Sequence, residues 1–296
     1  MSTANFSNLT SELANFTRPR LVSQQELYAW FTVTIVVGAI GAIFTCCLLM
    51  IMIVLNKFQT GSGIMIAHSQ IVDFIICTIL NIVQNATILQ VQSGRFTPID
   101  CRTVQFLQML FVFVGNWSAV FLAANRFVAI VMPFYYKKVT THWTLALSLL
   151  TAWAISLGCS LPMYLNFNVV LGMQPTGACG TLKITGPFFG IMGFVSTYLP
   201  IALLGVLYIT LFLLQKFSRF TERYRTEPSE RQRESHRRRI ALAKVLFCSF
   251  LWYCLCMLPP PILINFYPDV WRREFRLLMW TRTLLMVGYA VNPHRF

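Results

Sequence analysis

Two ionisable residues, Asp73 and Arg282, lie inside long apolar stretches of the sequence. A charged side chain in the middle of a bilayer costs several kcal/mol unless it is hydrated, paired or neutralised, so each is a candidate binding residue. Asp73 is able either to hold a cation or to serve as a protonated, water-bridged structural residue. Arg282 suits an anionic ligand such as a carboxylate, a phosphate or an acidic peptide end. The alternative for Arg282 is that its guanidinium extends to the lipid headgroups.

No pattern of residues indicates an enzyme. The histidines and cysteines are too dispersed along the chain to suggest a metal cluster. The stretch Gly61-Ser62-Gly63 places a serine between glycines, but we expect no base to be placed beside it, and a short inner-loop turn is the better interpretation. We therefore expect no catalytic residue, no metal centre and no cofactor, apart from a sodium ion considered below.

The composition predicts that this chain resides in a lipid bilayer. Of its 296 residues, 56% are hydrophobic and only 11% are charged, and the mean hydropathy is +0.62. The net charge of +14 does not indicate nucleic acid, because the basic residues are concentrated between the apolar stretches. A basic cytoplasmic side of a membrane protein explains the same excess.

The apolar stretches predict seven membrane-spanning helices. A bilayer core of ~30 Å needs ~20 apolar residues in a helix. We expect an all-α membrane protein, a seven-transmembrane helix bundle over residues 29–296, preceded by an extracellular segment at 1–28. The approximate spans are 29–55, 64–90, 103–132, 143–165, 186–214, 241–266 and 276–296. No room remains for a separate soluble domain, and no internal repeat is evident.

Glycosylation signals and basic residues predict the orientation in the membrane. Asn5, Asn8 and Asn15 each begin an Asn-X-Ser/Thr triplet, which favours an extracellular amino terminus and attached glycans. The segment Lys216 to Lys244 has ten basic and four acidic side chains, which favours the cytoplasm. Residues 1–28 lack a cleavable signal, so the first span has to direct insertion. We predict a multi-pass protein of the plasma membrane.

Cys101 and Cys179 differ from the other seven cysteines, most of which lie within apolar spans as packing residues. Both fall on the predicted outer side, one at the start of the third span and one in the loop after the fourth. Because that side is oxidising, a disulfide between them is chemically permitted.

Short motifs occur in order along the spans from Cys101 onward. They are Asn125-Arg126-Phe127 with Pro133, Trp153, Pro200 and Tyr208, Cys256-Met257-Leu258-Pro259, and Asn292-Pro293 followed by Phe296. In order and spacing they resemble the motifs of the rhodopsin-like (class A) G-protein-coupled receptor family, and the resemblance covers roughly residues 27–296. Phe58-Gln59-Thr60 and Asp73 resemble the family's first inner loop and second-helix aspartate.

This resemblance implies a receptor in which an extracellular ligand shifts a helix-bundle equilibrium that a heterotrimeric G protein detects. Departures from the family pattern are Asn125 for aspartate, Phe127 and Phe296 for tyrosine, Met257 for tryptophan and Thr45 for asparagine. The chain is therefore expected to be a divergent member, of an invertebrate chemoreceptor type or an orphan. A receptor-like scaffold without signalling and a membrane transporter or channel are the alternatives.

The resemblance also assigns roles to single residues. Those implied in G-protein coupling or switching are Asn125, Arg126, Tyr208, Pro259, Asn292, Pro293 and Phe296. Arg126 is expected to contact the G protein, the alternative being an arginine that only reaches the membrane interface. With Asn125 beside it, the usual carboxylate is absent, which predicts raised basal signalling. Pro200 and the prolines from Pro259 onward are expected to kink their helices.

For ligands, the resemblance points to Gln108, Met257 and Arg282. Gln108 lies 18 residues before Arg126, roughly 27 Å along a helix, which places it near the outer mouth. A glutamine there disfavours a biogenic amine. Arg272, Arg273 and Arg276 in the adjoining loop add positive charge, which favours an anionic small molecule or peptide.

The resemblance implies a sodium ion at Asp73 together with Asn292, although Gly115 stands where the third helix usually supplies a hydroxyl. The chain ends at Phe296 without the short amphipathic helix that the family implies, which is consistent with a truncated product.

Overall fold

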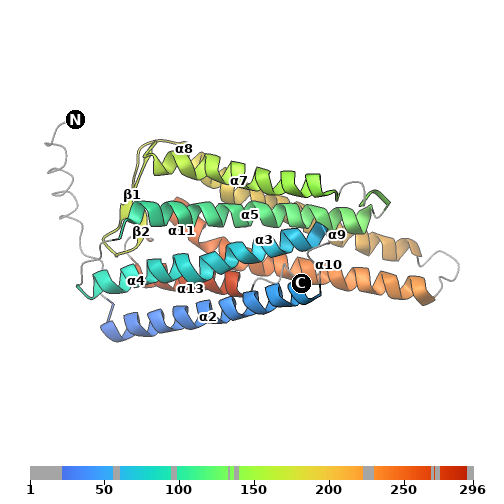
Figure 1. The fold of residues 1–296 in the computed structure, drawn as a ribbon, viewed down its shortest axis with the longest axis horizontal. Coiled ribbons are helices and arrows are strands. Elements are labelled where there is room, and N and C mark those ends of the chain that lie inside the picture. The colour runs from blue at the N-terminus through green and yellow to red at the C-terminus, as the bar shows by residue number, and fades with distance from the viewer. Residues whose placement is uncertain are drawn as a thin grey trace.

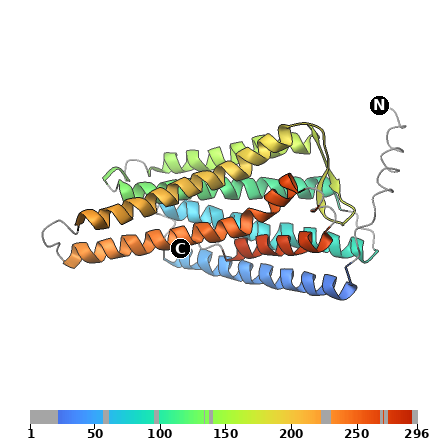
Figure 2. The same cartoon turned by 180° about the vertical axis from the view of Figure 1, so that it is seen from behind.

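The structure is a computed structural model that describes residues 22–55, 61–94, 99–132, 134–136, 140–222, 230–267, 270 and 274–291. Within this part, long helices lie side by side as an elongated bundle, with one small β-hairpin at one end (Figure 1). Seen from behind, α9 and α10 extend beyond the other helices at the opposite end (Figure 2). We call these the hairpin end and the α9–α10 end.

The described helices form seven columns. The first, third, fourth and seventh columns are single helices: α2 (Gln24–Val54), α5 (Cys101–Val131), α7 (His142–Tyr164) and α13 (Phe275–Ala290). The second contains α3 (Gly61–Ile75), the π-helical turn η2 (Ile76–Leu80) and α4 (Asn81–Gln92). The fifth contains α8 (Phe188–Gly193), the π-helical turn η3 (Phe194–Tyr198) and α9 (Leu199–Glu222), and the sixth contains α10 (Glu230–Met257) and α11 (Pro259–Phe266).

The outer surface of the bundle is apolar, as a lipid environment requires. Ile43, Leu150 and Val206 are each more than 60% exposed, and many other large apolar side chains share this outward position. Six of the columns are long and apolar enough to cross a membrane by length and composition. The seventh, α13, has 16 residues in the described part. The chain is an all-α multi-pass membrane protein, as the hydropathy pattern predicts.

Polar residues begin three of the long helices. Ser23, Asp100 and Thr141 are the N-caps of α2, α5 and α7, and the side-chain oxygen of each accepts a backbone N–H from the first turn. These bonds satisfy donors that the first turn of a helix leaves without an intrahelical partner. In Asp100, hydrogen bonds, chiefly from the Thr103 hydroxyl, lower the pKa of the carboxyl group.

The hairpin after α7 was not predicted from the sequence. Strands β1 (Val169–Met173) and β2 (Cys179–Ile184) pair antiparallel, and Gly177 in the turn between them has a φ of +84°, a conformation that favours glycine. The predicted disulfide joins Cys101 at the start of α5 to Cys179 at the start of β2. It closes a loop with a sequence separation of 78 residues, which restricts the unfolded chain and fastens the hairpin to the third column.

One expectation about the loops is wrong. The predicted spans 186–214 and 241–266 leave a loop between them, but α9 continues to Glu222 and α10 begins at Glu230. No proline or glycine interrupts the sequence from Val206 to Glu227, so α9 can extend past its apolar span. Hydropathy marks where the bilayer ends, whereas backbone hydrogen bonding decides where a helix ends.

Small residues allow α2 and α13 to pack closely. A Cβ added to Gly41 would lie 2.8 Å from the Ala290 Cβ and 2.9 Å from its Cα. Apolar attraction does not drive helices together in lipid, so close backbone approach at small residues supplies van der Waals contact instead.

We expect Gly41→Ala to lower the thermal unfolding midpoint of the purified protein, because overpacking at a rigid contact costs about 1–3 kcal/mol. Gly158→Ala in α7 is the matched control, since a Cβ there would meet nothing within 4 Å. The control should be neutral or stabilising by up to ~1 kcal/mol, because alanine favours a helix over glycine. Equal midpoints for the two variants would contradict the close contact.

Candidate functional site

Arg282 points into the bundle near the hairpin end. It lies two turns into α13, and its Nη1 donates a hydrogen bond to Oε1 of Gln84 on α4 at 2.7 Å. Among the described residues, no carboxylate lies within ion-pair distance of this guanidinium. The side chain is therefore engaged across the bundle, and the alternative that it extends to the headgroups does not fit this geometry.

Two glutamines that sequence analysis did not select continue this contact. Nε2 of Gln84, which is 3% exposed, donates to Oε1 of Gln105 on α5 at 3.1 Å. Arg282, Gln84 and Gln105 thus form a polar chain across the seventh, second and third columns. The only signal in the sequence was the presence of glutamine within apolar spans, which does not reveal which residues meet.

The other two predicted ligand residues lie on the third and sixth columns. Gln108 is one helical turn from Gln105 on α5, and its Oε1 is buried without a hydrogen-bond partner among the described residues. Met257, at the last position of α10, is 5% exposed and faces Gly288 of α13. A Cβ on Gly288 would approach the Met257 methyl carbon to 3.1 Å, so this methionine packs between the sixth and seventh columns.

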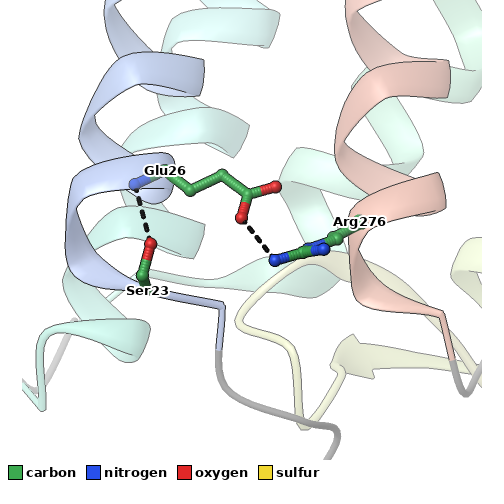
Figure 3. A network of polar contacts seen from close by, with 3 residues as sticks. All are labelled: Ser23, Glu26 and Arg276. Carbon is green, nitrogen blue, oxygen red and sulfur yellow. Dashed lines mark hydrogen bonds and ion pairs between the residues drawn. The ribbon is translucent and has the colours of Figure 1, made fainter.

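Arg276 has a different position from the one expected. It was assigned to the loop before the seventh span, but it lies in the first turn of α13 and pairs with Glu26 of α2, with 2.8 Å between Nη2 and Oε2 (Figure 3). Its side chain is 67% exposed, so the pair adds little stability. Arg276 is neutralised by Glu26, and Arg272 and Arg273 lie outside the described residues.

Trp30 connects the first column to the seventh beside Arg282. Its Nε1 donates to the Met279 carbonyl at 2.9 Å and to the Thr283 hydroxyl at 3.0 Å, and its side chain is fully buried. This tryptophan holds the turn of α13 that carries Arg282 against α2.

Asn116 joins three columns in the middle of the bundle. Its Nδ2 donates to the Ser196 carbonyl in η3 at 2.9 Å, and its Oδ1 accepts from the Tyr253 hydroxyl of α10 at 2.6 Å. Pro200 has no N–H, so it cannot make the helical bond to the Ser196 carbonyl four residues earlier. The Asn116 amide supplies a donor to that carbonyl and connects α5 with the fifth and sixth columns.

The fifth and sixth columns each depart from a continuous α-helix close to a proline. The π-helical turn η3 ends two residues before Pro200, and α10 ends at Met257 with α11 beginning at Pro259. The helix is therefore interrupted at Leu258 in the hairpin half of the sixth column. Such interruptions are places where a column can bend.

A second polar contact joins the second, third and fourth columns. Trp153 Nε1 donates to His68 Nε2 at 3.0 Å, and the other ring nitrogen of His68 lies 3.4 Å from the Ser118 hydroxyl. Trp153 was selected from the sequence, whereas its histidine partner was seen only as an isolated residue.

Three of the residues implied in coupling or switching, Asn125, Arg126 and Tyr208, lie in the half of the bundle toward the α9–α10 end. Pro259 lies in the hairpin half, at the start of α11. Arg126 and Asn125 lie near the end of α5, and Asn125 Oδ1 accepts from the Thr140 hydroxyl at 3.4 Å. Tyr208 is 3% exposed and its ring contacts Phe250 with centroids 6.1 Å apart. Asn292, Pro293 and Phe296 lie outside the described residues, so their predicted roles stay predictions.

The structure describes one of the two residues predicted for the sodium site. Asp73 on α3 is 1% exposed, but Asn292 lies outside the described residues. Gly115 faces Val72 on the neighbouring column, and a Cβ there would meet the valine side chain at 3.6 Å.

Asn5, Asn8 and Asn15 also lie outside the described residues, so glycosylation stays a prediction.

The comparisons with known proteins agree with this geometry. The family described as "7 transmembrane receptor (rhodopsin family)" matches residues 45–294. Galanin receptor 2a of Danio rerio is 24% identical over 269 residues, which are 88% of this chain and 69% of that receptor. Olfactory receptor 7A42 of Mus musculus is 27% identical over 139 residues, 46% of this chain and 42% of that receptor. A putative neuropeptide Y receptor type 6 of Homo sapiens is 27% identical over 141 residues, 47% of this chain and 46% of that receptor.

We expect Arg282→Gln to raise the unfolding midpoint of the ligand-free protein by roughly 2–5 °C, because it removes a positive charge that no described carboxylate offsets. Arg276→Gln is the matched control, since it breaks an exposed ion pair and should shift the midpoint little. A midpoint several degrees lower in Arg282→Gln would instead make Arg282 a structural residue.

Tyr253→Phe should lower the midpoint, since it removes the donor to Asn116 Oδ1 and leaves a buried acceptor, at a cost of about 1 kcal/mol. Tyr135→Phe serves as control because Tyr135 is 61% exposed. If both variants unfold at the wild-type temperature, Asn116 does not hold the columns together.

Proposed function

This chain belongs to the rhodopsin family of seven-transmembrane receptors, and from that premise we propose that it detects an anionic extracellular ligand and activates a heterotrimeric G protein. The observation that carries the proposal is Arg282, an inward-pointing guanidinium near the hairpin end whose described partner is a neutral amide. A receptor of this family acts by binding and conformational change, so we infer that the chain is not an enzyme.

We infer that the hairpin end faces the outside of the cell. The Cys101–Cys179 disulfide lies at this end, and disulfides persist in oxidising compartments. The glycosylation triplets at Asn5, Asn8 and Asn15 precede α2, whose amino end lies at the same end of the bundle (Figure 1). The plasma membrane is then the location that exposes the site to external ligands.

The positive charge of Arg282 supports an anion as the ligand. A guanidinium presents several donors in a plane and stays ionised, which suits it to a carboxylate or a phosphate. An arginine whose one hydrogen bond to a described residue goes to a neutral amide retains most of this binding capacity. A cationic amine would meet repulsion from the same group, since Gln108 and Gln84 have no charge to offset it.

A change in helix position at the ligand site can be transmitted to the α9–α10 end through the contacts of Asn116. Its two hydrogen bonds join the proline-interrupted fifth column to the sixth column, at the centre of the bundle between Arg282 and Arg126. The sixth column is also interrupted at Leu258, close to Met257. A ligand that shifts α13 against α10 changes the Met257–Gly288 packing, and this is a differential contact of the kind that a population shift requires.

At the cytoplasmic end, Arg126 and the extended helices α9 and α10 are the proposed contact with the G protein. The basic residues between Lys216 and Lys244 also favour an anionic leaflet, at ~1 kcal/mol for each basic residue near the surface. Both proposed interactions support the inference that this end faces the cytosol. Asn125, Met257 and Phe296 depart from the family pattern and favour a second candidate, a receptor-like scaffold that binds without signalling.

Nucleotide exchange on purified heterotrimeric G proteins, added to membranes that contain the full chain, separates these candidates. We expect basal exchange above empty membranes, a several-fold decrease in Asn125→Asp because a carboxylate would restrain Arg126, and loss of exchange in Arg126→Ala. Gly158→Ala, at equal surface expression, should match wild type. Exchange no faster than in empty membranes across a panel of G-protein classes would favour the scaffold, and equal exchange in Asn125→Asp would contradict the role of Asn125.

A further inference from the structure

The orientation of both amides in the polar chain follows from Arg282. A guanidinium only donates hydrogen bonds, so Gln84 has to present its oxygen to Arg282 and its nitrogen to Gln105. Gln105 therefore presents its oxygen to Gln84, which leaves its own N–H₂ group directed elsewhere. One positive charge thus fixes the direction of hydrogen bonds across three columns.

The result is a cluster in which unused donors outnumber unused acceptors among the described residues. Arg282 has five N–H donors and uses one on a described residue, and the N–H₂ group of Gln105 donates to no described residue. Each of the two amide oxygens in the chain already accepts one hydrogen bond. A binding partner for this cluster has to accept hydrogen bonds and carry negative charge.

One turn further along α5, the site offers a hydrogen-bond acceptor in place of donors. Gln108 is three residues after Gln105, about 4.5 Å along the helix, and its buried Oε1 has no described donor. A buried acceptor without a partner is costly, and a ligand that donates an N–H or O–H would satisfy it. The site therefore places a donor cluster and an acceptor about one helical turn apart.

We propose that Arg282, Gln84 and Gln105 bind the carboxylate of the ligand, while Gln108 accepts a hydrogen bond from an amide N–H or a hydroxyl close to that carboxylate. This inference rests on the proposed function and specifies the ligand class. The matching chemistry is an N-acylated amino acid or the free carboxyl end of a peptide. One guanidinium and two neutral amides match the single charge of a carboxylate better than the double charge of a phosphate monoester.

This chemistry has two sources, the free carboxyl end of a peptide and a small N-acylated acid. The carboxylate and the neighbouring donor are shared by both, so the source becomes an outcome of the experiment.

The test uses small probes on the purified full chain in nanodiscs of neutral lipid, at constant ionic strength. The probes are N-acetylglycine, its uncharged amide N-acetylglycinamide, and acetate, each at about 50 mM. We expect N-acetylglycine to raise the unfolding midpoint by about 2–5 °C, acetate to raise it less, and N-acetylglycinamide to leave it unchanged. Equal shifts with the acid and its amide, or no shift with either acid, would overturn the proposal.

Variants test which residues cause the shift of the unfolding midpoint by N-acetylglycine. Arg282→Gln and Gln105→Leu should abolish the response to N-acetylglycine, and Arg282→Lys should retain part of it. Gln108→Leu should reduce the response to N-acetylglycine to that of acetate, because only the former has an N–H for the Gln108 oxygen. Gly158→Ala should respond as wild type, and a wild-type response in Arg282→Gln would contradict the assignment.

Two further measurements complete the experiment. One distinguishes a peptide from a small acid as the ligand, and the other distinguishes failure of the carboxylate site from failure of G-protein coupling. Acetyl-triglycine with a free carboxyl end, compared with its amidated form, should exceed N-acetylglycine in effect if the natural ligand is a peptide and should not if it is a small acid. Basal nucleotide exchange is measured on the same preparations without any probe. Failure of the probes with intact exchange overturns only the carboxylate site, whereas absent exchange with intact probe binding overturns only the coupling.

Discussion

The lipid surroundings require that each backbone N–H and C=O find a partner within the protein, and the rest of this structure depends on that requirement. Helices meet it within themselves, which explains why seven columns account for nearly all described residues. Where a column departs from the α-helix, a neighbour can supply the missing bond. Asn116 does so for the Ser196 carbonyl that Pro200 cannot serve, and the same amide then reaches Tyr253. A local backbone defect has thereby become a contact among three helices.

Buried polar side chains divide the bundle into regions with different chemistry. Near the hairpin end, Arg282 orients Gln84 and Gln105, and among the described residues these bonds leave N–H donors unused. In the middle, Asn116 and Tyr253 satisfy one another and hold the columns together. The contrast is between a cluster that another molecule can complete and one that is already complete. The first is suited to recognition and the second to transmitting a change in helix position.

Much of the fold could be predicted from the sequence, since hydropathy and helix length follow from local composition. The disulfide between Cys101 and Cys179 could also be predicted, because their positions relative to the spans put both cysteines on the same side of the membrane. The β-hairpin and the π-helical turns were not, since they depend on packing against the columns. The length of α9 was underestimated because hydropathy does not register a helix that continues into water. For the site, Arg282 was found as a charge among apolar residues, whereas Gln84 and Gln105 had no such contrast.

The sequence by itself determined that this chain is a membrane bundle, which of its residues are unusual in such a bundle, and which family it resembles. Those properties are encoded in residue type and spacing along one chain. The tertiary structure alone decided that Arg282 faces Gln84, 198 positions away, rather than the headgroups, and that Asn116 meets Tyr253, 137 positions away. The rotation of each helix about its axis follows from packing with its neighbours, and this rotation decides which polar groups meet.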